Sequence, residues 1–423
     1  MDLEAVDMLA ARPEPEPAQE VRVAPGSWKT RRSAVVRAEP RSDSAALGLL
    51  AAGIRLPRTE PIVTDECPWG WLAVDPTGFV CAEVDGSRRD PSDEVLPELP
   101  RGMRIPGAYG RVKGEGATIY DSLASARASV GGRSPEASLT VRRLTTVRAG
   151  GRTFWKTRHG LIETKHIHRM RGSSFSGVEL QGEGAPSLPL AWTVGSWDRQ
   201  TITARRGPRT GSRVAAKLGK RKAHAILEQS DNGRWVRLEE GWVARSDLRI
   251  VEQVERPIAA SESERWLDID LSEQTLVAYE GDTPVFATLI SSGRPGHKTP
   301  TGVFRIDRKV AERTMNSMAD SDDLYSVDKV PWTAYFATGY ALHAAFWHSG
   351  FGTRRSHGCV NLSPKDAERL YGWTAPRVAP GWEEIYGHED QPGSIVQIRS
   401  RRDPEPELRG YALNMVTKAA EPG

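Results

Sequence analysis

The sequence predicts a mainly β protein built from several small units. Three stretches share one pattern, in which a Trp is followed within five to seven residues by a Gly and then by apolar and β-branched residues. These pairs are Trp71 with Gly78, Trp155 with Gly160, and Trp235 with Gly241. Alternating runs broken by Gly, Pro, Asp and Ser are typical of short antiparallel strands joined by turns.

The last unit, residues 262–400, has a different sequence pattern from the three before it. It opens with alternating runs that predict a hairpin, WLDIDLSEQTLVAYEGDTPVFATLISSG, and further strand-like runs follow. Within it, SPKDAERLYGW combines a cap at Ser363 with helix formers, so we expect a short helix from Pro364 to Tyr371. The predicted fold is a series of small β units followed by a β-rich domain with one or two short helices.

Length, charge and hydropathy narrow the function classes. The 423 residues are enough for about three average domains. A net charge of +3, from 58 basic and 55 acidic residues, argues against a nucleic-acid or membrane-surface partner. Residues 45–54, the longest apolar stretch, are about half of what a transmembrane helix needs. The acidic, Pro-rich N-terminus lacks the features of a secretory signal, so we expect a cytoplasmic protein or one whose export segment is absent from this chain.

The three β units resemble bacterial SH3-like modules, in which a run such as Gly-Trp-hydrophobic and a later Gly-(Trp/Phe)-Val run close a small β-barrel. The second unit is the loosest match. The resemblance divides the chain into a flexible leader at 1–30, SH3-like modules at 31–86, 108–172 and 198–254, a catalytic region at 262–400, and a C-terminal tail at 401–423.

The chemistry of the chain is expected at Cys359, within RRSHGCVNLSP, with His343 sixteen residues upstream. A thiol becomes a nucleophile as thiolate, and a nearby imidazole supplies this as general base or ion-pair partner. Gly358 permits a tight turn, so that backbone N–H groups can point at the oxyanion of a tetrahedral intermediate.

Two other interpretations of these residues remain open at this point. Cys359 fits a buried, inert thiol and His343 a hydrogen-bonded core histidine. The second interpretation is a zinc site, since His343, His348, His357 and Cys359 are four potential zinc ligands. The spacing H-x4-H followed by H-x-C is not a common closed structural zinc arrangement, so no metal is predicted.

A family resemblance favours catalysis. SHGCVNL, preceded by a His in the hydrophobic strand GYALH, resembles the signature of the L,D-transpeptidase catalytic domain, the YkuD family. The TPTGVF run and the hairpin ending in SSG match that family in the same order, over residues 262–400. The resemblance implies a β-sandwich-like domain and a cysteine acyltransferase of peptidoglycan.

The resemblance also implies roles for single residues. Cys359 would be the nucleophile, His343 the proton acceptor and donor, and the Ala344 carbonyl would orient the His343 ring. Gly358 and Cys359 would present the oxyanion donors. His357 and Ser356 would shape the motif loop, and Asn361 and Tyr340 would contact substrate. Many relatives have Arg at the position of Asn361, and an uncharged Asn is a poorer ligand than Arg for a substrate carboxylate.

The implied reaction is the cross-linking of stem peptides through a cysteinyl thioester, without metal or organic cofactor. Water as acceptor would make the enzyme a carboxypeptidase, and a D-amino acid would give exchange; a non-catalytic wall-binding scaffold is the alternative from another class. Carbapenem-type inhibitors are expected to acylate Cys359. Because the substrate lies outside the cytoplasmic membrane, the family implies a protein exported to the periplasm or cell envelope.

An exported location also has implications for the redox state of Cys67 and Cys81 and for the role of the modules. In an oxidising compartment Cys67 and Cys81 could pair, and the alternative is two buried thiols. The modules would bind wall glycan or stem peptides. The third module also carries a basic cluster that could meet anionic wall polymers or be an ordinary solvated face: Arg205, Arg206, Arg209, Arg213, Lys217, Lys220, Arg221 and Lys222.

Overall fold

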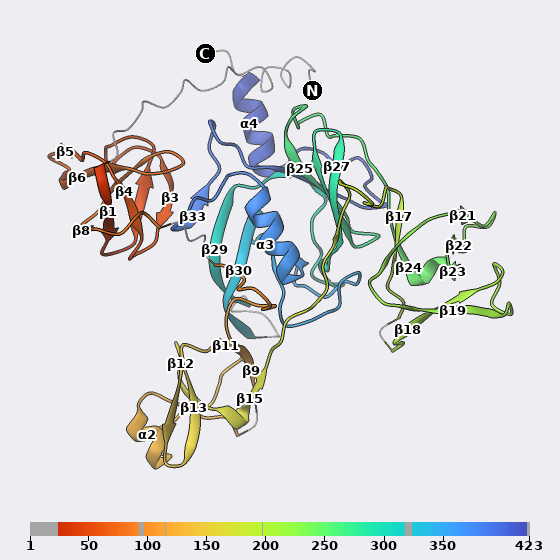
Figure 1. The fold of residues 1–423 in the computed structure, drawn as a ribbon, viewed down its shortest axis with the longest axis horizontal. Coiled ribbons are helices and arrows are strands. Elements are labelled where there is room, and N and C mark those ends of the chain that lie inside the picture. The colour runs from red at the N-terminus through yellow and green to blue at the C-terminus, as the bar shows by residue number, and fades with distance from the viewer. Residues whose placement is uncertain (1–23, 93–96, 115, 197, 318–323, 421–423) are drawn as a thin grey trace.

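A computed structural model describes residues 24–92, 97–114, 116–196, 198–317 and 324–420. The fold is mainly β, and the described α helices are α2 (Leu123–Ala128), α3 (Pro364–Trp373) and α4 (Gly410–Ala420). Three β modules surround a central domain (Figure 1). Across the described ranges, no helix is both long and apolar enough to cross a membrane.

Module 1, drawn in red and orange, forms one sheet of order β4-β1-β8, and contributes the run β3-β2-β7-β6-β5 to a second sheet (Figure 1). A disulfide joins Cys67 to Cys81 on the paired strands β6 and β7, with 5.9 Å between their Cα atoms. The strands are β1 (Ala24–Thr30), β2 (Ala34–Arg37), β3 (Ala46–Leu50), β4 (Arg55–Arg58), β5 (Ile62–Thr64), β6 (Cys67–Ala73), β7 (Phe79–Cys81) and β8 (Val84–Ser87).

Module 2 pairs its strands as β10-β14-β13-β12 and as β15-β9-β11. Trp155, 1% exposed, lies in a core with Ile162 and Val141. The elements are β9 (Tyr109–Val112), β10 (Ile119–Tyr120), β11 (Ser138–Arg142), β12 (Thr145–Ala149), β13 (Arg152–Thr157), β14 (Gly160–Glu163), the 3-10 helix η1 (Thr164–His166) and β15 (Ile167–Arg169).

Module 3 forms sheets of order β20-β17-β24 and β19-β18-β23-β22-β21. Its elements are β17 (Leu190–Thr193), β18 (Thr201–Arg205), β19 (Val214–Gly219), β20 (Ala223–Ala225), β21 (Glu228–Gln229), β22 (Trp235–Leu238), β23 (Gly241–Ala244), the 3-10 helix η2 (Arg245–Asp247) and β24 (Leu248–Val251). Each module thus divides its strands between two sheets. A closed barrel is found nowhere in the described ranges, so SH3-like modules stay a prediction.

The central domain packs two sheets and helix α3 around one core, which contains Leu276, Phe336, Val360 and Leu370. One sheet has the order β16-β27-β26-β25-β34-β28; the other contains β29, β30 and β33, with β31 and β32 at the side of β30. The strands are β16 (Val178–Glu179), β25 (Arg265–Asp270), β26 (Thr275–Glu280), β27 (Thr283–Leu289), β28 (Gly302–Arg305), β29 (Arg308–Asn316), β30 (Tyr325–Ala337), β31 (Tyr340–Ala344), β32 (Val360–Leu362), β33 (Trp382–Tyr386) and β34 (Ile395–Arg399).

Three element boundaries differ from the expected ones. Residues 24–30, expected in the flexible leader, form β1, because this strand pairs with β4 and β8; the leader's first 23 residues lie outside the described ranges. The segment 190–193, ahead of the predicted third module, forms β17 between β20 and β24. The tail beyond 401 includes α4, which contacts β28 and β30.

Backbone pairing joins two modules to the central domain. Strand β3 of module 1 pairs antiparallel with β33, and β11 of module 2 pairs in parallel with β30, with Leu139 opposite Ser326. The buried Asp328 carboxylate extends the second contact by accepting hydrogen bonds from Arg158 and from the Arg142 N–H. A single sheet therefore runs from module 2 through the central domain into module 1.

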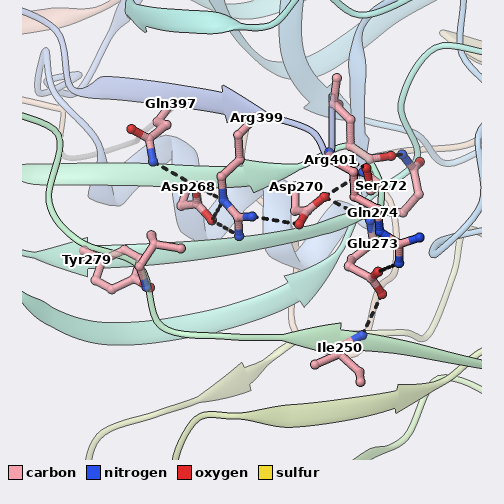
Figure 2. Close-up of polar contacts among 12 residues, drawn as sticks. Ile250, Asp268, Asp270, Ser272, Glu273, Gln274, Tyr279, Gln397, Arg399 and Arg401 are labelled. Atoms are coloured by element: carbon pink, nitrogen blue, oxygen red, sulfur yellow. Dashed lines mark hydrogen bonds and ion pairs between the residues drawn. The ribbon is translucent and has the colours of Figure 1, made fainter. Parts of the chain in front are cut away.

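Module 3 is attached through a shared hydrophobic cluster, in which Trp192 and Val251 lie with Trp266, and also through charged side chains (Figure 2). Glu273, buried after β25, accepts hydrogen bonds from Arg245 and from the Ile250 N–H, both in module 3. Beside it, Arg399 binds Asp268 through two nitrogens and Asp270 through a third, at 2.8–3.1 Å. Burial raises the pKa of Asp268, and the guanidinium of Arg399 opposes this.

Removing Arg399 should cost stability, because it leaves two carboxylates uncompensated in the interior. We expect Arg399→Ala to lower the free energy of unfolding by about 3–5 kcal/mol, measured by denaturant titration. The control is Arg401→Ala, since the Arg401 side chain contacts Glu273 but is 73% exposed; it should change stability by less than about 1 kcal/mol. Equal effects of the two substitutions would contradict this account.

Candidate functional site

The parallel pairing of β31 with β32 brings Cys359 and His343 onto one face. Leu342 pairs with Val360 and His343 with Asn361. Cys359 directly precedes Val360, so it lies beside Ala341. Side chains alternate along a strand, so His343 and Cys359 emerge on the same face as diagonal neighbours.

The His343 ring is held in one tautomer. Its Nδ1 lies 3.1 Å from the Ala344 carbonyl oxygen, so Nδ1–H donates and Nε2 is left as the acceptor. The side chain is 3% exposed and its ring stacks on that of Trp347. Burial lowers the pKa of His343 to about 4, so at neutral pH the ring is uncharged and can take a proton.

The Cys359 thiol is partly exposed and is also uncharged at neutral pH. Burial raises the pKa of Cys359, and a hydrogen bond from the backbone of Ala341 only partly opposes this. Its Sγ lies 3.7 Å from the Gly339 carbonyl oxygen. Among the described contacts none joins Sγ to His343, so the side chain must turn from Gly339 before the two can exchange a proton.

Hydrogen bonds tie the loop before Cys359 into one conformation. Ser356 Oγ accepts from the Gly358 N–H at 3.0 Å and donates to the Cys359 carbonyl at 2.5 Å. Thr299 Oγ1 donates to the Gly358 carbonyl at 2.7 Å. Gly358 has φ +123°, and a Cβ there would lie 2.7 Å from Tyr340 Cε1, so only Gly fits. Tyr340 therefore supports the loop from beneath.

The expected oxyanion role of Gly358 needs revision for this conformation, because Ser356 already takes its N–H. That N–H becomes available only if the Ser356 bond breaks. Thr299 was not singled out from the sequence, although it belongs to the quoted TPTGVF run. Its partner Gly358 is 59 residues away, and only the fold reveals that contact.

The structure does not support Asn361 as a substrate contact. The residue is 2% exposed, and its amide lies 2.9 Å from His348 Nε2. His348 Nδ1 accepts from the Gly350 N–H, and burial lowers the pKa of His348 to about 3, so the neutral ring donates through Nε2–H. Exchanging the nitrogen and oxygen of the Asn361 amide gives its otherwise unpartnered Oδ1 this donor. Asn361 thus lies on the same face as His343 but is buried against His348.

The described residues do not bring together a set of side chains that could bind zinc. Nowhere in the described ranges do three His, Cys, Asp or Glu side chains gather as metal ligands. His343 and His348 both have a ring nitrogen bound to backbone groups. His357 is exposed and lies within 2.9 Å of Arg294, a cation that would disfavour a bound metal ion.

Comparison of this chain with known proteins finds a family match that includes the site. Residues 264–398 match the YkuD family, the L,D-transpeptidase catalytic domain. A putative L,D-transpeptidase of Bacillus subtilis is 25% identical over 135 residues, which cover 25% of this chain and 59% of that relative. The chain thus matches less than two thirds of that relative's length.

Solved L,D-transpeptidases are among the structures that match this chain. The catalytic domain of the Enterococcus faecium enzyme is 24% identical, with 32% of this chain and 97% of that chain covered and a TM-score of 0.25. The Mycobacterium smegmatis enzyme is 16% identical, with 53% and 100% covered and a TM-score of 0.27. The Enterococcus faecium domain has also been solved acylated by ertapenem. The match to the L,D-transpeptidase catalytic domain of the YkuD family thus falls within the central domain, at residues 264–398.

Proposed function

We propose that this protein is a peptidoglycan L,D-transpeptidase that cross-links stem peptides through a thioester on Cys359. The observation that carries the proposal is the His343 ring, which lies on the same strand face as Cys359. Its Nδ1–H donates to the Ala344 carbonyl, which leaves Nε2 to act as the base. A histidine with a purely structural role would not require an oriented ring with an unprotonated Nε2 on the same face as a thiol.

The resting pair is a neutral thiol and a neutral imidazole, so proton transfer accompanies attack. His343 Nε2 takes the Sγ proton as Cys359 Sγ bonds to the carbonyl carbon of the donor stem. The C–N bond then breaks, and His343 returns the proton to the departing amine. An acceptor amine attacks the thioester and gives a proton to His343, which passes it back to the departing sulfur.

The oxyanion of each intermediate needs donors. The Cys359 N–H is the natural first one, because it follows Gly358 at the turn. The Gly358 N–H becomes a second if Ser356 Oγ rotates away, which would couple substrate binding to a change in the loop. Tyr340 contributes by holding the turn, with its ring directly beneath Gly358.

The surrounding modules fit a role in binding the cell wall. Of the basic cluster in module 3, Arg206, Arg209, Arg213, Lys217 and Lys222 are exposed. Lys220 and Arg205 donate to backbone carbonyls within the module, so they serve its structure. The exposed cations flank the β18–β19 hairpin, where they could meet an anionic wall polymer.

The proposed location is outside the cytoplasm, in the periplasm or cell envelope. The Cys67–Cys81 disulfide supports it, because such bonds persist in oxidising compartments. With that pair oxidised, Cys359 is the free thiol among the three cysteines of the chain. A single reactive thiol is what a cysteine acyltransferase needs in such a compartment.

Cys359→Ala should abolish new cross-links between stem peptides and the adduct of a carbapenem, because no thiol remains to be acylated. Chromatography of muropeptides and mass spectrometry of the intact protein measure the two effects. Cys67→Ser/Cys81→Ser is the matched control and should keep the adduct. Muropeptides that stay cross-linked by the Ala variant would rule out the thioester; shortened or exchanged stems from the wild type would reveal water or a D-amino acid as acceptor.

The pH dependence of acylation follows from the neutral pair. With the pKa of His343 at about 4, carbapenem acylation should be flat from pH 8 to pH 5 and halve near pH 4, where the ring becomes charged and loses its acceptor. His343→Gln should slow acylation by about 10²- to 10⁴-fold. Stopped-flow fluorescence measures the rate, and an inflection between pH 6 and 7 would contradict a neutral resting pair.

Wall binding should depend on the exposed cations of module 3. Arg206→Ala/Arg209→Ala/Arg213→Ala in the full chain should weaken sedimentation with purified sacculi severalfold at low salt and by less at high salt. The control replaces exposed arginines elsewhere, Arg88→Ala/Arg101→Ala/Arg148→Ala, and should change binding little. If both triple variants sediment alike, the cluster is only a solvated surface.

A further inference from the structure

A cluster of one arginine and two histidines joins the β27–β28 loop to the loop that precedes β32. Arg294 NH2 is 2.9 Å from His357 Nε2 and 3.4 Å from His297 Nε2. The rings of His297 and His357 meet edge to face, with 4.6 Å between their centroids. We call these three residues the Arg294 cluster.

Backbone contacts fix this cluster to the catalytic loop. The Arg294 N–H donates to the Ser356 carbonyl at 3.0 Å, and Gly293 pairs with Ser356 in an isolated bridge. Thr299 closes the far end of the same loop by accepting from the Gly293 N–H while it donates to the Gly358 carbonyl. The backbone of Arg294 is therefore held against the loop that presents Cys359.

Tyr325 places the cluster within electrostatic reach of the thiol. Its ring lies 5.1 Å from that of His357. Burial raises the pKa of Tyr325; the charge of a Cys359 thiolate raises it further, and the charge of Arg294 lowers it. The Tyr325 phenol thus lies near enough to both groups to interact electrostatically with each.

The position after the nucleophile cannot supply a cation here. Asn361 is uncharged and buried, and its amide is bound to His348. The half-buried Arg294, by contrast, combines a permanent charge with a fork of donors suited to a carboxylate. His357 Nε2 accepts from one of its nitrogens and so helps to orient the guanidinium.

We propose that Arg294 binds the terminal carboxylate of the donor stem peptide. This rests on the proposed transpeptidase function, in which the leaving residue carries that carboxylate next to the amide that Cys359 attacks. His357 and His297 are positioning residues, because they touch the guanidinium and not the carboxylate. The inference makes Arg294 a determinant of specificity for donors with a free C-terminal acid.

Alkylation of Cys359 tests the anion site without requiring transpeptidation. Iodoacetate carries a carboxylate and iodoacetamide does not, and the disulfide leaves Cys359 as the free thiol. Arg294→Ala should lower the ratio of the two rate constants at pH 7.5 by about threefold or more, and Arg294→Lys by less. The control Lys298→Ala removes an exposed charge from the same loop and should leave the ratio unchanged. An unaltered ratio in Arg294→Ala, or an equal fall in Lys298→Ala, overturns the proposal.

Donor selectivity tests the substrate assignment. For a tetrapeptide stem ending in D-Ala, Arg294→Ala should raise KM for the free acid about 10- to 100-fold and change kcat little. The C-terminal carboxamide of the same stem should react alike with wild type and variant, which a misfolded loop would not allow. Equal losses on acid and amide overturn the assignment. A lowered alkylation ratio in a protein that transfers no stem peptide would instead refute the proposed function and retain the anion site.

Discussion

The parallel pairing of β31 with β32 is the constraint on which the site depends. It places His343 opposite Asn361. Cys359 is two residues before Asn361, so its side chain emerges on the same face as that of His343. On its other side β32 pairs with Ser291, whose N–H and carbonyl both bond to the backbone of Asn361. Because β32 has backbone partners on both sides, a one-residue slip would turn Cys359 away from His343.

The modules extend this framework and restrict the elements that surround it. Strand β30 pairs with β31 and also with β11 of module 2, so its first residues, including Tyr325, are held from outside the catalytic domain. From the other side, Arg249 of module 3 donates to the Gly352 carbonyl, in the loop that leads to Ser356. Both modules thus contact segments next to the nucleophile, which gives them a positional effect as well as any part in binding the wall.

Local sequence patterns predicted the elements and residues whose reasons are local. The capping Ser363 predicted α3, which extends two residues beyond the expected Tyr371. The run SHGCVNL pointed to Cys359 and the strand GYALH to His343, while the family resemblance implied the Ala344 carbonyl that the His343 ring contacts. Contacts across long separations could not be predicted: Thr299 with Gly358, and Arg294 with His357, 63 residues apart. The contact of Asn361 with His348, 13 residues away, could not be predicted for the same reason.

Burial shifts the pKa values of Cys359 and His343 in opposite directions, and in both groups it favours the uncharged form. Desolvation raises the pKa of Cys359 and lowers that of His343, so an ion pair is disfavoured at rest. A neutral pair protects the thiol from oxidation, which proceeds through the thiolate. Charge must then appear during attack, where donors at the turn can stabilise it. In the proposed role, Arg294 therefore meets the donor carboxylate at a site whose thiol is still neutral.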